Sequence, residues 1–187
     1  MSVPSEVLSR SPVKLTYEQY VLFPNDGNRH EIIDGRHYMN ASPSTRHQAV
    51  SRYLQYYLFE QIELKGLGDV IDAPLDVQLS PTDVVQPDLV VVLKHNRIIT
   101  PSKIMGTPDL VIEILSPSTR QTDMNLKKRL YEQFLVPEYW IVDPEDQTIL
   151  QHHLNSDGRY NAPKICTTEI KYHGVPNGVT VNLTLVW

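Results

Sequence analysis

Two stretches of the chain hold nearly unbroken apolar strings that start alike. They are "QPDLVVVL" (residues 86–93) and "TPDLVIEIL" (residues 107–115), and each opens with Pro-Asp-Leu-Val. Short apolar, β-branched runs that follow a proline are typical of strands covered on both faces of a sheet. The pattern therefore predicts two central core strands.

Apolar and aromatic residues recur every three or four positions in two other segments, which predicts two amphipathic helices. The first spans about 45–64, with Ser44 or Thr45 as its cap. The second spans about 122–135, with Thr122 as its cap. A shorter helix, through about Leu22, is predicted where "TYEQ" (residues 16–19) has the form of a capping box.

Further strands follow from turn signals and alternation. Asp34-Gly35 predicts a tight hairpin, because such turns need positive φ. Residues 69–81 and 83–93 each read as one strand, 138–143 as a buried strand that stops at Pro144, 148–154 as another, and 178–187 as an alternating strand. The predicted fold class is α/β: a mixed sheet with a helix against each face, in a single domain 1–187 with a loose N-terminal arm (1–14).

Composition narrows the setting of this domain. The 187 residues are 41% hydrophobic and 21% charged, with a formal net charge of −5. A nucleic-acid binder is more usually basic over a face, although a local basic patch is compatible with a net acidic chain. Cys166 is the single cysteine, so no intrachain disulfide forms, which fits a reducing cytoplasm. Neither a signal peptide nor a bilayer-length apolar run is evident, so we expect a cytoplasmic protein with no membrane partner.

Candidate chemistry begins with Glu113, which interrupts an apolar strand. Strand alternation puts it on one face with Val111 and Leu115, where an unpaired carboxylate is costly. It therefore needs a cation, a donor or a metal. If the two core strands are adjacent, Asp88 approaches Glu113, and a hard divalent cation relieves their repulsion. The structural alternative makes Asp88 and Asp109 caps of strands or turns, and pairs Glu113 with a structural Lys or Arg.

The predicted second helix offers a cation. Asp123, Lys127 and Tyr131 follow each other at intervals of four and share one helix face. Lys127 is placed to reach the end of the strand that carries Glu113. The alternative is a surface Asp123–Lys127 pair worth only tenths of a kcal/mol.

At this point the chain resembles a known family. "IIDGRHYM", "SPSTRHQAV", "VVQPDLVVV" and the long segment 108–144 are together similar to the Uma-two (Uma2) family, which is grouped with the PD-(D/E)XK nuclease superfamily. The resemblance runs from about residue 16 to 144. It implies a restriction-endonuclease-like fold with an α-β-β-β-α-β core, and it implies an endonuclease activity.

The resemblance also implies a set of site residues. Asp88 matches the Asp of the Pro-Asp motif, and Glu113 matches the acid of the (D/E)-x-K element. Leu115 stands where that element has its lysine, and Lys127 on the next helix is the substitute. Glu31 corresponds to an upstream acid that many such nucleases add to the metal shell.

These parts suit metal-dependent hydrolysis of DNA. Asp88, Glu113 and the backbone carbonyl of Ile114 would hold Mg²⁺ or Mn²⁺, and Lys127 would orient water or offset charge. Asp123 would fix Lys127.

Three further residues have weaker cases. His47 would contact phosphate or aid proton transfer, or else simply pack at the helix start. Arg46 and Lys128 are candidate DNA phosphate contacts, and solvated surface positions otherwise.

Three questions stay open at the level of sequence. A catalytically inactive nuclease-fold protein that binds nucleic acid or protein is the alternative function. A carboxylate-pair glycosidase fits less well. A homodimer, paired through the alternating C-terminal strand, is compatible with the pattern.

Overall fold

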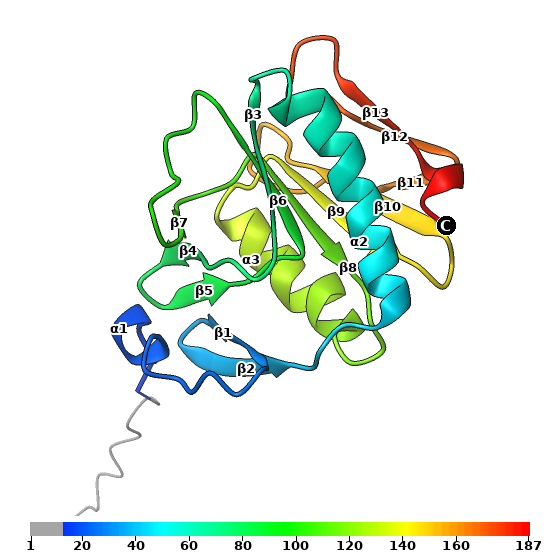
Figure 1. The fold of residues 1–187 in the computed structure, drawn as a ribbon. Coiled ribbons are helices and arrows are strands. Elements are labelled where there is room, and N and C mark those ends of the chain that lie inside the picture. The colour runs from blue at the N-terminus through cyan, green and yellow to red at the C-terminus, as the bar shows by residue number, and fades with distance from the viewer. Residues whose placement is uncertain (1–12) are drawn as a thin grey trace, which may run out of the picture.

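The computed structural model describes residues 13–187, so most of the predicted arm (1–14) lies outside the described residues. Its centre is a six-stranded sheet in the order β11-β10-β9-β8-β6-β3 (Figure 1). The strands are β3 (Gly68–Asp72), β6 (Leu89–Leu93), β8 (Leu110–Ile114), β9 (Glu138–Asp143), β10 (Thr148–His153) and β11 (Lys164–Cys166). β8 and β9 are parallel and the other pairs antiparallel, so the sheet is mixed as predicted.

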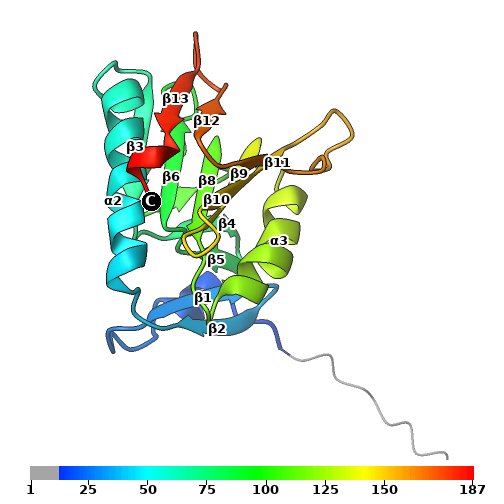
Figure 2. The ribbon, with the colours of Figure 1, turned by 90° about the vertical axis from the view of Figure 1, so that its right-hand side faces the viewer.

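Helices cover both faces of this sheet (Figure 2). α2 (Thr45–Leu58), prolonged by the π-helical turn η1 (Phe59–Glu63), packs on one face. The π-helical turn η2 (Thr122–Lys127) and α3 (Lys128–Gln133) form one continuous helix on the other face. The alternation along β8 divides its residues between two hydrophobic cores: Ile112 and Ile114 belong to the α2 side, and Val111 and Leu115 to the α3 side. Glu113 therefore faces α3.

A five-stranded sheet in the order β2-β1-β5-β4-β7 closes one end of the central sheet (Figure 1). It contains β1 (Arg29–Ile33), β2 (Arg36–Asn40), β4 (Val77–Ser80), β5 (Asp83–Val85) and β7 (Ile104–Met105). The predicted hairpin joins β1 to β2, and Asp34 and Gly35 both have positive φ, at 51° and 70°.

Three shorter elements complete the description. α1 (Tyr17–Tyr20) begins at the predicted capping box, where Gln19 Oε1 accepts the N–H of Thr16 at 3.0 Å. β12 (Glu169–Tyr172) and β13 (Val179–Asn182) form a separate two-stranded sheet, and the 3-10 turn η3 (Leu183–Leu185) follows. None of the helices in residues 13–187 is long and apolar enough to cross a membrane.

Several predicted boundaries were wrong. Residues 69–81 and 83–93 each form two strands in different sheets, because Pro74 and Pro87 fall in them and proline cannot donate to a strand ladder. Thr122 does not cap the second helix, which already includes Gln121. α1 ends at Tyr20 rather than near residue 22, and the last strand ends at Asn182. The break after β5 matters most, because it places Asp88 where the chain crosses between the sheets.

Candidate active site

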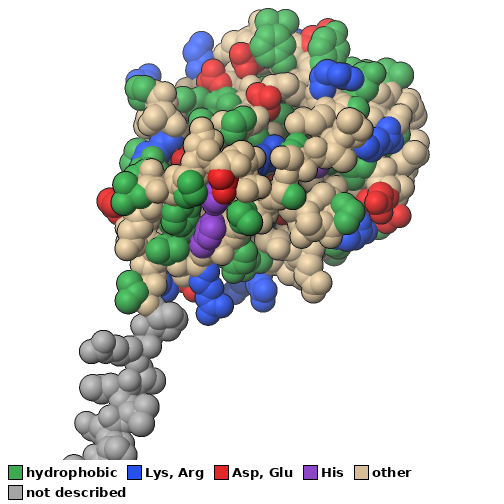
Figure 3. Space-filling view, turned by 60° about the horizontal axis from the view of Figure 1, so that its bottom comes forward, with side chains coloured by type: hydrophobic (Ala, Val, Ile, Leu, Met, Phe, Trp, Pro, Cys, Tyr) green, Lys and Arg blue, Asp and Glu red, His purple; other side chains and the backbone are tan. Residues whose placement is uncertain are grey.

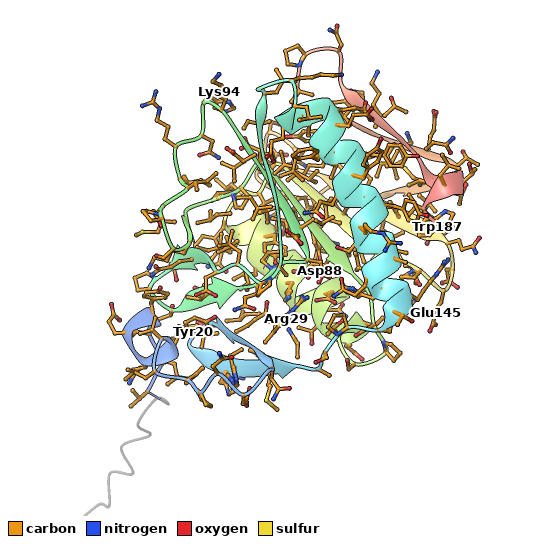
Figure 4. All side chains as sticks on the ribbon, in the orientation of Figure 1. Tyr20, Arg29, Asp88, Lys94, Glu145 and Trp187 are labelled. Carbon is orange, nitrogen blue, oxygen red and sulfur yellow. The ribbon has the colours of Figure 1, made fainter. Side chains whose placement is uncertain are left out.

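Asp88 lies at the crossing between the two sheets, immediately before β6. Its Oδ1 accepts a hydrogen bond from Arg29 Nη1 at 2.7 Å, and its Oδ2 lies 2.9 Å from the N–H of Ile114 and 3.1 Å from His47 Nε2. Burial pushes the pKa of Asp88 upward, but these three partners outweigh burial and hold the pKa below its ordinary value. Figure 4 shows Arg29 pointing toward Asp88 from the hairpin. Asp88 is therefore a firmly held, ionised carboxylate.

Glu113 faces Asp88 across the strand pair. Leu89 pairs with Ile112, so the antiparallel register sets Glu113 opposite Asp88 one step further on. Glu113 Oε1 accepts the Tyr131 hydroxyl at 2.7 Å and the Lys127 ammonium at 3.0 Å, while Oε2 has no hydrogen bond within residues 13–187. Burial, aided by the neighbouring acids, raises the pKa of Glu113 well above its ordinary value, although Lys127 opposes the rise.

Lys127 is buried among carboxylates. Its Nζ lies 2.9 Å from Glu31 Oε1, 3.0 Å from Glu113 Oε1 and 3.6 Å from Asp123 Oδ1, and each side chain is at most 4% exposed. Burial lowers the pKa of Lys127, but the three acids outweigh burial and raise the pKa well above its ordinary value. Burial raises the pKa of Asp123 to about 6 despite Lys127. The ammonium stays charged, and the acids around it compete for one cation.

Glu31 comes from β1 in the neighbouring sheet. It is fully buried, and it accepts the N–H of Gln86 at 2.7 Å and the Asn40 amide at 2.8 Å, besides Lys127. Glu31 does not line the pocket that contains Asp88 and Glu113. Its contacts make it a support for Lys127 and a bridge between the two sheets.

A small pocket opens onto these groups. Its volume is about 30 Å³, which is room for about one or two water-sized occupants. Of the predicted site residues, six line it: His47, Asp88, Glu113, Ile114, Asp123 and Lys127. The second helix, β8, α2 and the segment just before β6 therefore converge on one cavity, although the residues come from widely separated parts of the sequence.

The donor set around the pocket fits a hard cation. Within residues 13–187 no three His, Cys, Asp or Glu side chains are arranged as a ready metal cage. Mg²⁺ nevertheless usually takes one or two carboxylates and keeps several waters. Four acids (Glu31, Asp88, Glu113 and Asp123) face two permanent cations (Lys127 and Arg29) here, so acids outnumber the cations that could neutralise them. The pocket can accept a divalent ion on charge and on ligand chemistry.

Two predicted nucleic-acid contacts lie away from the pocket. Arg46 is exposed at the start of α2, and Lys128 is half-buried on the second helix. Neither lines the cavity.

Two other residues belong to the site but were not proposed from sequence. Tyr131 donates a hydrogen bond to Glu113. Its spacing of four residues from Lys127 places both side chains on one helix face, and this spacing was visible in the sequence. Arg29 had no such signal, because 59 positions separate it from Asp88.

The fold is a mixed α/β fold, and it contains a small pocket lined by buried acids and a buried lysine. The chain belongs to the Uma2 family, whose model matches residues 17–184 and is described as "Putative restriction endonuclease".

A curated protein and a solved structure illustrate what the chain is similar to. It is 28% identical over 147 residues to the uncharacterized protein slr1290 of Synechocystis sp., covering 78% of this chain and 77% of that protein. A crystal structure described as a "putative nuclease belonging to DUF820" from Anabaena variabilis superposes with a TM-score of 0.74 at 18% identity, covering 92% of this chain and 97% of that chain. The second likeness shows the shared fold.

Proposed function

We propose that this protein is an endonuclease that hydrolyses DNA phosphodiester bonds with Mg²⁺ or Mn²⁺ bound in the pocket beside Asp88 and Glu113. One observation carries the proposal. Buried acids outnumber the permanent cations around a cavity of about 30 Å³ that also holds a buried lysine. A purely structural ion pair has no need of this excess, because each additional buried carboxylate is costly.

The residues that would hold the ion are Asp88, Glu113 and Ile114. Within residues 13–187, Asp88 Oδ1 has one hydrogen-bond partner, Arg29, and Glu113 Oε2 has none, so both oxygens retain lone pairs. The N–H of Ile114 points to Asp88, and the N–H and C=O of one strand residue leave the strand on the same side. A bound divalent ion acts as a Lewis acid and lowers the pKa of a coordinated water.

Lys127 supplies the fixed positive charge of the site. Glu31, Glu113 and Asp123 hold its ammonium in place, and its raised pKa keeps it protonated. It therefore acts as a donor that orients water or offsets charge on the phosphate, and not as a general base. His47 orients Asp88 through its ring nitrogen.

Arg29 is placed to bind substrate. Its guanidinium pairs with Asp88 and lines the pocket, where a phosphate oxygen would approach. Arg46 and Lys128 lie outside the pocket and would contact DNA phosphates further along the strand. Cleavage of both strands of a duplex would use two copies of the chain.

The test is cleavage of plasmid and oligonucleotide DNA with Mg²⁺ or Mn²⁺. We expect the wild type to cut, and EDTA or the Glu113→Ala substitution to abolish cutting. Circular dichroism and thermal melting check that the variant is folded. A wild type that cuts no DNA with either ion, or an equally active Glu113→Ala variant, contradicts the proposal.

The second candidate function is a nuclease-fold protein that binds nucleic acid or protein without catalysis. It is favoured by the Lys127 ammonium, which already neutralises part of the acid cluster, and by the lack of a three-ligand cage within residues 13–187. Binding of DNA that is unaffected by Mg²⁺ and accompanied by no cleavage would support it.

A further inference from the structure

A second cavity adjoins the candidate active site. Its volume is about 340 Å³, within the range of pockets that take small organic groups. It lies between α1, the segment that leads into β1, and the crossing between the sheets. Figure 3 views the molecule from the hairpin side, where histidine side chains lie among hydrophobic and acidic ones. Its walls include Tyr20, Phe23, His30, Asp76 and Gln86.

Gln86 connects this cavity to the active site. It lines both cavities. Its backbone N–H donates to Glu31, which contacts Lys127, and its side-chain amide donates to Tyr20 Oη at 3.0 Å and to Asp76 Oδ1 at 2.9 Å. Gln86 thus lies between the scissile phosphate expected at Asp88 and the occupant of the second cavity.

The cavity presents aromatic rings. Phe23 is half-buried, and its ring centroid lies 4.6 Å from that of His37, 5.6 Å from that of His30 and 5.7 Å from that of Tyr20. These three rings pack against the Phe23 ring and fix its orientation. A fixed aromatic ring at the wall of a cavity is a stacking surface for a nucleobase.

Asp76, on the polar wall of the cavity, favours hydrogen-bond donors. Asp76 Oδ1 accepts the Tyr20 hydroxyl at 2.6 Å and the Gln86 amide, whereas Oδ2 has no hydrogen bond within residues 13–187. A carboxylate oxygen without a proton accepts hydrogen bonds and cannot donate them. Oδ2 is therefore suited to the amino group of cytosine, adenine or guanine, and thymine has no amino group to offer.

We propose that this cavity is a nucleobase subsite that takes one unpaired, amino-bearing base of the DNA strand whose phosphate enters the active site. The inference rests on the proposed nuclease function and adds its substrate class, DNA with an unpaired base beside the scissile bond. Phe23 stacks on the base, Asp76 accepts from its amino group, and Gln86 fixes the distance between base and phosphate.

The experiment measures binding of fluorescein-labelled 12-mers of dC, dA and dT by anisotropy, with Ca²⁺ in place of Mg²⁺ to slow cleavage. We expect the wild type to bind dC and dA more tightly than dT. Phe23→Ala should weaken binding of all three by about fivefold or more, the lower end of a base–aromatic stack. Asp76→Asn should abolish the preference for dC and dA and leave dT binding within about twofold.

Matched variants keep the test decisive. Phe23→Trp retains an aromatic face and should bind like the wild type, which separates stacking from folding. Leu22→Ala alters an adjacent side chain that is 80% exposed and does not line the cavity, so it should change nothing.

Two results distinguish failure of the subsite from failure of the nuclease function. A wild type that cleaves DNA, but whose Phe23→Ala and Asp76→Asn variants bind as it does, overturns the subsite and leaves the function standing. A wild type that cleaves no DNA overturns the function on which the subsite rests.

Discussion

The same four residues, Pro-Asp-Leu-Val, lead into β6 and β8, but the two strands carry different side chains near their last residues. They are antiparallel neighbours, and each opening aspartate accepts the N–H of the last residue of the other strand: Asp88 from Ile114 at 2.9 Å, and Asp109 from Leu93 at 2.8 Å. The two ends of the strand pair are therefore related by an approximate local two-fold axis. The repeated Pro-Asp-Leu-Val is a way of closing a strand pair at both ends.

The two ends differ in charge. Opposite Asp88 stands Glu113, whereas the equivalent position opposite Asp109 is Val92, which is buried in the apolar core. Asp88 is bound by Arg29 and His47, whereas Asp109 receives the Asn96 amide at 3.0 Å. The end of the strand pair with Val92 is therefore structural. The end with Glu113 is the candidate catalytic end.

The largest effect should come from neutralising one aspartate at a time. Asp88→Asn and Asp109→Asn both keep an oxygen that can accept the backbone N–H of the facing strand. We expect Asp88→Asn to lower the rate of DNA cleavage about 10⁴-fold, equivalent to about 5.5 kcal/mol, because it removes a proposed metal ligand. Asp109→Asn should cleave within about threefold of the wild type. Similar losses in the two variants would mean that the strand closure, and not the charge, is what activity needs.

The next largest effect should come from removing Lys127, which pairs with the buried acids at the Asp88 end. Lys127→Met leaves three buried acids without their cation, so the free energy of unfolding at pH 8 should fall by about 3–5 kcal/mol in urea titrations. The raised folded pKa of Lys127 means that the ammonium is charged at pH 8 and at pH 5, so only the charge of its acidic partners changes between the two. The loss should shrink at pH 5, where Asp123 is mostly protonated.

Lys128→Met is the matched control, since this half-buried neighbour forms no ion pair with another residue of 13–187. It should change stability by less than about 0.5 kcal/mol. An equal loss of stability in both variants would contradict the claim that Lys127 neutralises the buried acids.

The sequence was informative wherever one residue broke a local pattern. Glu113 stood out as an acid in an apolar strand, and the four-residue spacing put Lys127 near it; both strands and the helix on each face also followed from periodicity. The sequence did not predict that residues 69–81 and 83–93 are each divided between two sheets. The alternation of apolar and polar residues indicates that a segment is a strand, but it does not indicate which strand pairs with it. Arg29 is tied to Asp88 across 59 positions, a contact that only the tertiary fold creates.

A smaller effect should reveal the excess of acid at the charged end. The pKa of Asp123 rises from 3.8 to about 6 on folding, so the folded state holds its proton longer than the unfolded state does. Metal-free stability should therefore fall as pH rises from about 4 to 6 and stay lowered above that. Asp123→Asn removes this penalty and should gain up to about 3 kcal/mol at pH 8 in EDTA, since one pKa unit is about 1.4 kcal/mol. The gain should vanish near pH 4; a variant less stable than the wild type at pH 8 would show that Asp123 is instead a net stabiliser of Lys127.

The smallest effect links the ion to one end of the strand pair. Mg²⁺ competes with protons for Glu113, whose folded pKa is raised, so Mg²⁺ should stabilise the protein more at pH 8 than at pH 5.5 and release protons on binding. At ten times its dissociation constant the ion should add about 1.4 kcal/mol to the free energy of unfolding. Calorimetric melting of the Asp109→Asn variant should show the full Mg²⁺ shift, whereas Asp88→Asn and Glu113→Gln should show none. A shift that survives in Glu113→Gln, or that is lost in Asp109→Asn, would place the ion elsewhere and remove the distinction between the two ends.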